Sequence, residues 1–225
     1  MSVPEKSEDQ NGTHVPEYRF GVVLLLLFAT FVFLASGPEG DWVAVVAVVL
    51  QGATLLAALS ASGVGRGLWR VAVAVVLVAL VAAGWQFIAG GSKVNASLFL
   101  VSLMLVGAAP IVITRSLIRR RVIDLRTVLG ALCVYVLLGM VWSFAFTAIG
   151  ILESEPFFKE QATATVADYL YFSFVTLTTV GYGDLTAASG IGRALAVLEA
   201  LIGQIYLVTV IALLVSQLAR RRSRS

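Results

Sequence analysis

Six long apolar stretches dominate this sequence and limit the folds that it can adopt. They run roughly over Phe20–Ser36, Trp42–Ser62, Trp69–Gly90, Ala96–Thr114, Val128–Ile151 and Ile191–Ala219. Each is close to the length of about 20 residues that a helix needs to cross the hydrocarbon core of a bilayer. The chain is 59% hydrophobic and 13% charged, whereas soluble domains carry about 25% charged residues. We therefore expect an all-α membrane protein with six transmembrane helices.

The basic residues outside these stretches predict how the chain is oriented. The tails and every second connecting segment hold most of them, namely Lys6, Arg19, Arg66, Arg70, Arg115, Arg119, Arg120, Arg121, Arg126, Arg220, Arg221, Arg222 and Arg224. The remaining segments hold Lys93, Lys159 and Arg193. Because cytoplasmic segments carry the excess of Lys and Arg, we expect a multi-pass protein of the plasma membrane with both termini in the cytoplasm. The segment between the fifth and sixth stretches then faces outward.

That outer segment contains the run Thr179-Val180-Gly181-Tyr182-Gly183. A potassium ion sheds its water when rings of backbone carbonyls replace its hydration shell. Consecutive carbonyls point to one side only if the backbone alternates between conformations, which Gly181 and Gly183 adopt without steric cost. We expect the side chains of Val180 and Tyr182 to pack behind the strand, and the hydroxyl of Thr179 to close its inner end.

This run is the potassium-channel signature, and Tyr171 to Thr179 resembles the pore helix of bacterial channels that carry it. The resemblance implies K⁺ sites at Thr179, Val180, Gly181 and Tyr182, with no other cofactor. One such strand cannot enclose an ion, and the sequence holds one copy. A pore therefore requires four chains, so each subunit should have three identical partners in a cyclic homotetramer. A re-entrant pore helix should precede the filter, because irregular backbone at membrane depth must be buried or line a cavity.

Several residues are candidates for supporting the filter, namely Thr178, Asp184, Glu199, Phe172 and Val175. Glu199 is the only acid inside the last apolar stretch, where a carboxylate is costly and is by default a functional hypothesis. It could accept hydrogen bonds behind the filter, or be protonated and only structural. Phe172 stands where many relatives have tryptophan and cannot hydrogen-bond to Asp184. The filter is therefore expected to have fewer braces than in relatives, which favours slow inactivation.

The last apolar stretch carries candidates for the gate. Gly203 resembles the hinge glycine of potassium-channel inner helices, and close packing on the pore helix is an equally good reason for a glycine there. Steps of four from Gly203 place Leu207, Ile211 and Val215 on one face of the helix. These residues could line the inner cavity and close by dewetting. Simple packing between helices is the alternative.

The first four stretches have the layout of a voltage sensor without its charges. The fourth has none within Ala96 to Thr114, and a helix without charge in the field senses almost no voltage. The basic cluster Arg115, Arg119, Arg120, Arg121 and Arg126 follows it, and such clusters suit contact with anionic lipid headgroups. We divide the chain into a cytoplasmic tail (1–19), a sensor-like four-helix domain (20–114), a basic linker (115–127), a pore domain (128–219) and a basic tail (220–225).

Together these features predict a channel that conducts K⁺ passively and is not an enzyme. Its partners would be potassium ions, three identical subunits and membrane lipids, with no nucleic acid. A less selective cation channel is disfavoured because Tyr182, not an acid, follows Gly181. A potassium-transporter subunit is disfavoured because such chains carry four degenerate filter loops. A non-conducting partner subunit stays open.

Overall fold

The computed structural model describes residues 18–37, 42–62, 65–89, 96–118, 125–153 and 155–216. They form helices α1 (Tyr18–Ala35), α2 (Trp42–Ser62), α3 (Arg66–Ala89), α4 (Ala96–Ile118), α5 (Leu125–Leu152), α6 (Val166–Leu177) and α7 (Gly190–Ile205). The last helix continues through a π-helical segment, η1 (Tyr206–Ile211). The described residues contain no β-strand, only an isolated bridge between Phe158 and Ala187. The expected all-α fold is confirmed for this part of the chain.

Four helical segments among the described residues are long and apolar enough to cross a membrane. They cover Val45–Ser62, Gly67–Trp85, Thr127–Leu152 and Gly190–Ser216. Among the described side chains, shorter apolar segments lie in α1 and α4, at Phe20–Ala35 and Met104–Arg115, and the side chains of α4 before Met104 lie outside the described residues. Helices thus occupy all six stretches expected from the sequence, but six complete spans stay a prediction.

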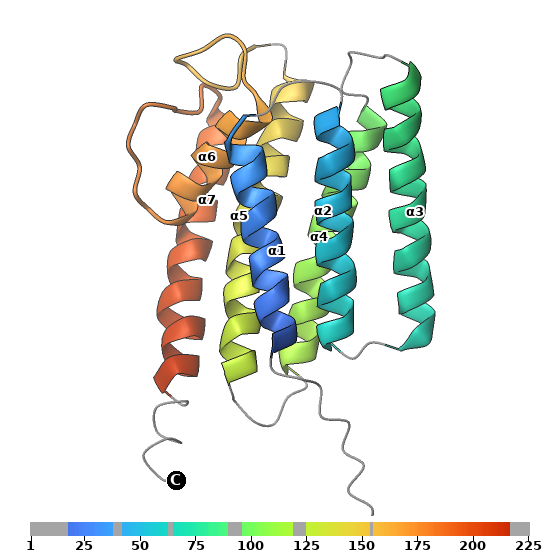
Figure 1. Cartoon of the computed structure of the whole chain (residues 1–225). Coiled ribbons are helices and arrows are strands. Elements are labelled where there is room, and N and C mark those ends of the chain that lie inside the picture. Colours follow the sequence, from blue (N-terminus) through green and yellow to red (C-terminus); the bar gives the residue numbers. More distant parts are fainter. Residues whose placement is uncertain are drawn as a thin grey trace, which may run out of the picture.

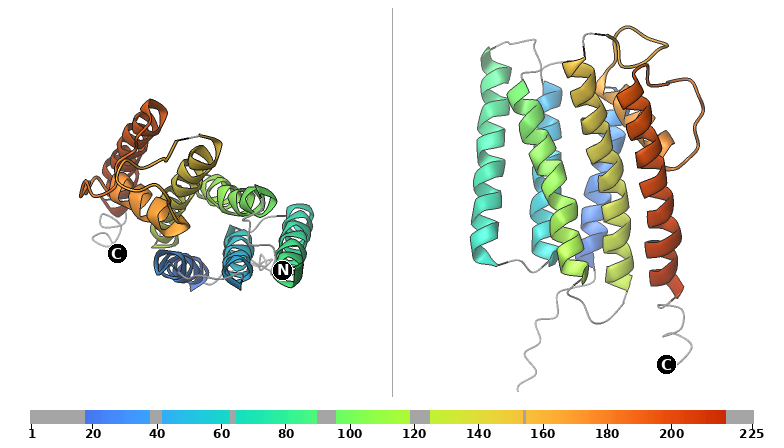
Figure 2. Two further views of the ribbon diagram at one scale, coloured as in Figure 1. Left: turned by 90° about the horizontal axis from the view of Figure 1, so that it is seen from above. Right: turned by 180° about the vertical axis from the view of Figure 1, so that it is seen from behind.

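The long helices lie side by side in one bundle (Figure 1). The helix α3 forms one edge and packs on α2 and α4, and α7 lies at the opposite edge (Figures 1 and 2). The short α6 lies at one end of the bundle, in contact with α1, α5 and α7. The loop that leads from α5 into α6 and the start of α7 therefore lie at the same end of the bundle (Figure 1).

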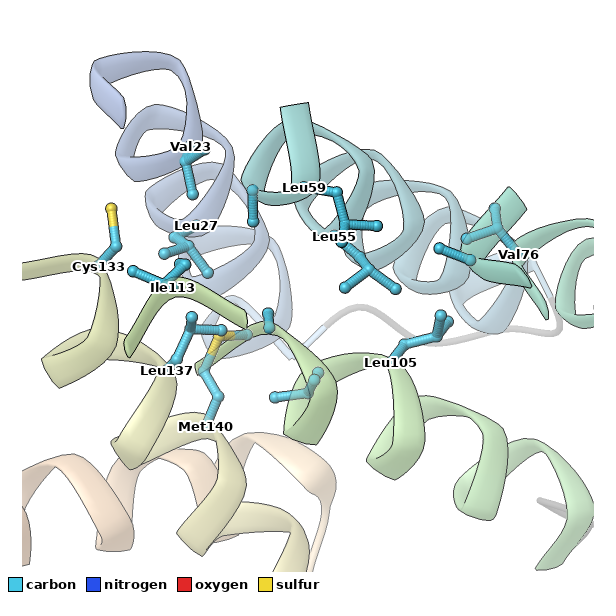
Figure 3. Packing of buried hydrophobic residues seen from close by; sticks show 14 of the residues in the cluster. Val23, Leu27, Leu55, Leu59, Val76, Leu105, Ile113, Cys133, Leu137 and Met140 are labelled. Carbon is cyan, nitrogen blue, oxygen red and sulfur yellow. The ribbon is translucent and has the colours of Figure 1, made fainter. Parts of the chain in front are cut away.

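The main hydrophobic core lies where α1, α2, α4 and α5 meet. Leu27, Leu55, Leu105, Leu137 and Met140 are buried there, one or two from each helix (Figure 3). Burial of a leucine or methionine side chain contributes about 1.5–3 kcal/mol. This core joins α1, α2 and α4 to α5 of the same chain.

A second contact joins the first helix to the pore helix region directly. The rings of Phe31 in α1 and Phe174 in α6 have centroids 4.6 Å apart. Near the start of α1, the Cys133 thiol of α5 lies 3.7 Å from the carbonyl oxygen of Phe20, to which it donates. The N-terminal helices therefore pack on α5 and α6 of their own chain.

Candidate functional site

The helix α6 begins at a capping box. The Thr165 hydroxyl accepts from the Asp168 amide at 3.3 Å, and Asp168 Oδ2 accepts from the Thr165 amide at 2.7 Å. These two bonds satisfy N–H groups that have no partner within the helix. They fix the start of the helix expected from the aromatic run.

Aromatic packing positions the outer half of α6. Phe172 is 7% exposed and contacts Phe146, Phe157 and Phe158, with ring centroids 5.1–5.9 Å apart. Phe146 comes from α5, while Phe157 and Phe158 come from the loop before α6. Phe172 therefore supports the helix by packing, and it makes no bond to the filter.

The end of α6 controls the backbone of the predicted filter. The amides of Val180 and Gly181 both donate to the carbonyl oxygen of Val175, at 2.9 and 3.3 Å. Thr178 donates to the carbonyl oxygen of Phe174 through its hydroxyl at 2.6 Å and its amide at 3.1 Å. Val175 and Thr178 thus belong to the filter support, Val175 through its main chain.

The filter backbone alternates as its glycines predict. Thr179, Gly181 and Gly183 have φ angles of 59°, 56° and 82°, while the residues between them are not in the positive-φ region. A positive φ costs little in glycine but is uncommon in threonine, so Thr179 is held there by its surroundings. Its amide donates to the carbonyl oxygen of Thr176 at 2.9 Å.

The side chains of Val180 and Tyr182 are largely exposed in the single chain, so their expected packing behind the strand stays a prediction. Val180 is 52% exposed and Tyr182 is 71% exposed. Tyr182 is stacked on Tyr171 of α6, with parallel rings 6.4 Å apart. Within one chain, most of the surface behind the filter is therefore uncovered.

Asp184 has a partner that the sequence did not indicate. The Tyr171 hydroxyl donates to Asp184 Oδ2 at 2.7 Å. Tyr171, one residue before Phe172, thus ties α6 to the end of the predicted filter, and the expectation of fewer braces than in relatives stays a prediction. Its stacking partner Tyr182 belongs to the predicted K⁺ site.

A second tie connects the loop before α6 to the segment after the filter. Both oxygens of Glu160 accept from Thr186, at 2.8 Å from the amide and 2.6 Å from the hydroxyl. These two bonds stabilise the carboxylate and lower the pKa of Glu160. The amides of Lys159 and Ala188 complete the pairing by donating to the carbonyl oxygens of Thr186 and Phe157, at 3.1 and 2.8 Å.

The helices α5, α6 and α7 meet at Ser173. Its hydroxyl oxygen lies 2.5 Å from Glu199 Oε1 of α7 and 2.7 Å from the Gly139 carbonyl oxygen of α5. Glu199 is 0% exposed. The acid predicted from the sequence therefore lies against α6, four residues before Gly203.

Gly203 packs against Leu177, the last residue of α6. A Cβ at this position would collide with the Leu177 carbonyl oxygen. The Tyr135 hydroxyl of α5 donates to the same oxygen at 3.3 Å. The packing reason for a glycine at this position is therefore observed.

The predicted gate stripe crosses the π-helical segment. Hydrogen bonds in a π-helix run from residue i to i+5, so its turn is wider than the 3.6 residues of an α-helix, and residues four apart stay close to one line along η1. Leu207 and Ile211 are half-buried and Val215 is exposed. Steps of four from Gly203 therefore stay on one side of the helix through Tyr206–Ile211, and the gate role of Leu207, Ile211 and Val215 stays a prediction.

The basic cluster is described only at its two ends. Arg115 is exposed in the last turn of α4, and Arg126 lies in the first turn of α5. Arg119, Arg120 and Arg121 lie outside the described residues. The predicted binding of this cluster to lipid headgroups therefore stays a prediction. The candidates for the filter and its support, by contrast, lie together around α6.

Comparison with known proteins finds a match in the part of the chain that holds the filter candidates. Residues 130–220 match a family model described as "Ion channel". No curated protein and no solved structure matches the chain. The matched segment contains α5, α6, the filter run and α7, which supports an ion-channel family for this part of the molecule.

Proposed function

We propose that this chain is one subunit of a potassium-selective channel that conducts K⁺ passively and is not an enzyme. The observation that carries the proposal is the alternating backbone of Thr179 to Gly183, with Val180 and Gly181 bonded to the Val175 carbonyl oxygen. Such a backbone turns successive carbonyl oxygens to one side, where they can replace the water of a dehydrated cation. K⁺ is the permeant ion, and no other cofactor is required.

The pore is proposed to be a homotetramer. Apolar residues of α7 are exposed in the single chain, among them Ile191, Val197, Leu201 and Ile205. The exposed Val180 and Tyr182 lie on the same unit of the chain. Three further copies would cover these surfaces and complete four rings of carbonyl oxygens around one axis.

We propose that the first four helices do not make the opening of the channel sensitive to voltage. Moving one charge across 100 mV is worth about 2.3 kcal/mol, so a sensor helix needs charges within the field. The sequence of α4 has none from Ala96 to Thr114. The hydrogen bond from Tyr171 to Asp184 is proposed to oppose the slow inactivation that the sequence favours.

The proposed orientation has the filter opening outside the plasma membrane and both termini in the cytoplasm. The first turn of α5 and the helical residues that follow η1 lie at the bundle end opposite to α6 (Figure 1). The basic linker and tail would then lie beside the inner leaflet, where lysine and arginine attract anionic lipids.

The test is ion flux into liposomes that contain the purified chain, with K⁺ and Na⁺ compared across a range of voltages. We expect K⁺ flux well above Na⁺ flux, and an open probability that is flat in voltage. Gly181→Ala should abolish the selectivity, because its φ of 56° is strained for alanine although no atom lies within 4 Å of the added Cβ. Gly84→Ala in α3 is the matched control, with the same open surroundings and no positive φ.

Each other outcome points to a different function. Equal K⁺ and Na⁺ fluxes would identify a less selective cation channel. Steep voltage dependence would contradict the uncharged sensor. No flux of either ion would favour a non-conducting partner subunit.

A further inference from the structure

Glu199 is a buried acid whose second oxygen has no partner. The residue is 0% exposed, and Oε2 makes no hydrogen bond in the described part of the chain, whereas Oε1 contacts Ser173. A carboxylate buried in this way would leave a charged oxygen unsatisfied, which is among the costliest arrangements in a protein interior. A neutral carboxylic acid leaves only a carbonyl oxygen there.

The number of protons needed to join three oxygen atoms, those of Glu199, Ser173 and Gly139, also favours the neutral acid. The Ser173 oxygen lies within hydrogen-bond distance of two oxygens, Glu199 Oε1 and the Gly139 carbonyl oxygen. A hydroxyl donates one proton. If Ser173 gave it to an ionised Glu199, two acceptor oxygens would face each other at 2.7 Å with no proton between them. If Ser173 donates to Gly139 instead, the 2.5 Å contact needs a proton from Glu199.

We propose that Glu199 holds a proton at neutral pH and donates it to Ser173, so that two hydrogen bonds in series tie α7 and α5 to the middle of the pore helix. Glu199 is a positioning residue: it acts through Ser173 and does not touch the permeating ion. Ionisation at alkaline pH removes one of the two protons and places a charge behind α6. The pore helix then loses its tie, and conduction falls.

Two other groups near Glu199 bear on this pH dependence. From α5, the phenol of Tyr135 interacts electrostatically with Glu199, and it also bonds to the Leu177 carbonyl oxygen. From α6, the contacting group is the Ser173 hydroxyl, which does not ionise in this range. No basic side chain of the described residues stabilises an ionised Glu199.

The first measurement is infrared spectroscopy of the reconstituted protein, which detects the C=O stretch of a protonated carboxyl group. We expect this band at neutral pH in the wild type, its loss in Glu199→Gln, and its disappearance from the wild type as pH rises. Glu155→Gln is the control, because Glu155 is an exposed acid of the outer loop. Ser173→Ala should shift the band, since the acid loses the oxygen that accepts its proton, and it serves if Glu199→Gln does not assemble.

The second measurement is K⁺ flux against pH, and this part rests on the proposed function. Glutamine keeps a donor for Ser173 and cannot ionise, so Glu199→Gln should conduct at neutral pH and keep its flux at the pH where wild-type flux is lost. Identical alkaline loss in both proteins would overturn the proposal, as would a protonated-carboxyl band that Glu199→Gln leaves unchanged. If the wild type carries no K⁺ flux, the channel function fails, and the infrared band alone decides whether Glu199 is protonated.

Discussion

At the scale of single residues, the candidate filter depends on atoms that differ in how far a sequence reveals them. Gly181 and Gly183 predict the alternating backbone directly, because glycine at every second position indicates positive φ angles at those positions. The acceptor role of Val175 was not predictable, since it involves a carbonyl group that every residue has. Tyr171 and Asp184 are 13 residues apart, and their bond depends on how the loop between them folds.

Tyr171→Phe tests the brace on the filter end. The substitution removes the hydroxyl that donates to Asp184 Oδ2 at 2.7 Å and keeps the ring beside Tyr182. We expect K⁺ flux to decay faster than in the wild type during prolonged activation, because the end of the filter is less restrained. Tyr169→Phe is the control from the same helix, where the hydroxyl makes no hydrogen bond within the described residues. Equal decay in wild type and Tyr171→Phe would contradict the role.

The hydrogen bonds from Thr186 to Glu160 should depend on the external pH. Because the bonds from Thr186 lower the pKa of Glu160 below its ordinary value of 4.5, the tie stabilises the outer loop at pH values above 4.5 and is lost as pH falls through the lowered pKa. We expect the Thr186 amide signal in NMR to shift along that acid titration. Thr186→Val keeps the amide and removes the hydroxyl, so it should raise the midpoint toward 4.5. An unchanged midpoint would show that the hydroxyl has no part in it.

At the scale of elements, the positions of the helices followed from the apolar runs. The orientation of α7 and the π-helical segment η1 did not. The run Gly190–Ser216 is apolar enough to cross a membrane, but this overall apolarity does not show which of its faces points where. The π-helical segment Tyr206–Ile211 is also invisible in such a pattern. It is held to α5 by Tyr206, whose hydroxyl donates to the Ala131 carbonyl oxygen at 2.8 Å and whose ring stacks on Tyr135.

Gly203→Ala tests the contact between α7 and the end of α6. The added Cβ would collide with the Leu177 carbonyl oxygen, and backbone cannot move aside as a flexible side chain can. Overpacking of this kind costs about 1–3 kcal/mol, so the free energy of unfolding should fall by that amount in a denaturation experiment. Gly84→Ala, with open space around the new Cβ, should leave stability unchanged or raise it by up to about 1 kcal/mol. Equal stability of the two variants would rule out the close contact.

At the scale of the whole molecule, the sequence predicted two units and left their connection open. The structure joins them within one chain, through α1 and α4 against α5 and through Phe31 against Phe174. Contacts between distant helices depend on the shapes of faces that are all apolar, which explains why the pattern of the sequence did not give them.

A short thiol cross-linker between Phe31→Cys and Phe174→Cys tests this packing in the assembled protein. The native Cys133 is buried and contributes no background. We expect cross-links within one chain, seen as monomers on a denaturing gel, because the two rings lie 4.6 Å apart in the same chain. Single-cysteine variants control for random collisions. Covalent dimers in the double variant alone would show that α1 packs on a neighbouring subunit.

The contact between α1 and α6 also sets an order of events during synthesis. Translation proceeds at about 5–20 residues per second, so the ribosome reaches Phe174 roughly 7–30 s after Phe31. In the proposed channel, α1 remains in the lipid during that interval without α6, on which it finally packs. Phe20 to Ala35 contains no charged residue, and Leu25, Phe28 and Val32 remain exposed even in the finished chain. The first helix is thus suited to wait in the bilayer until the last third of the protein has been made.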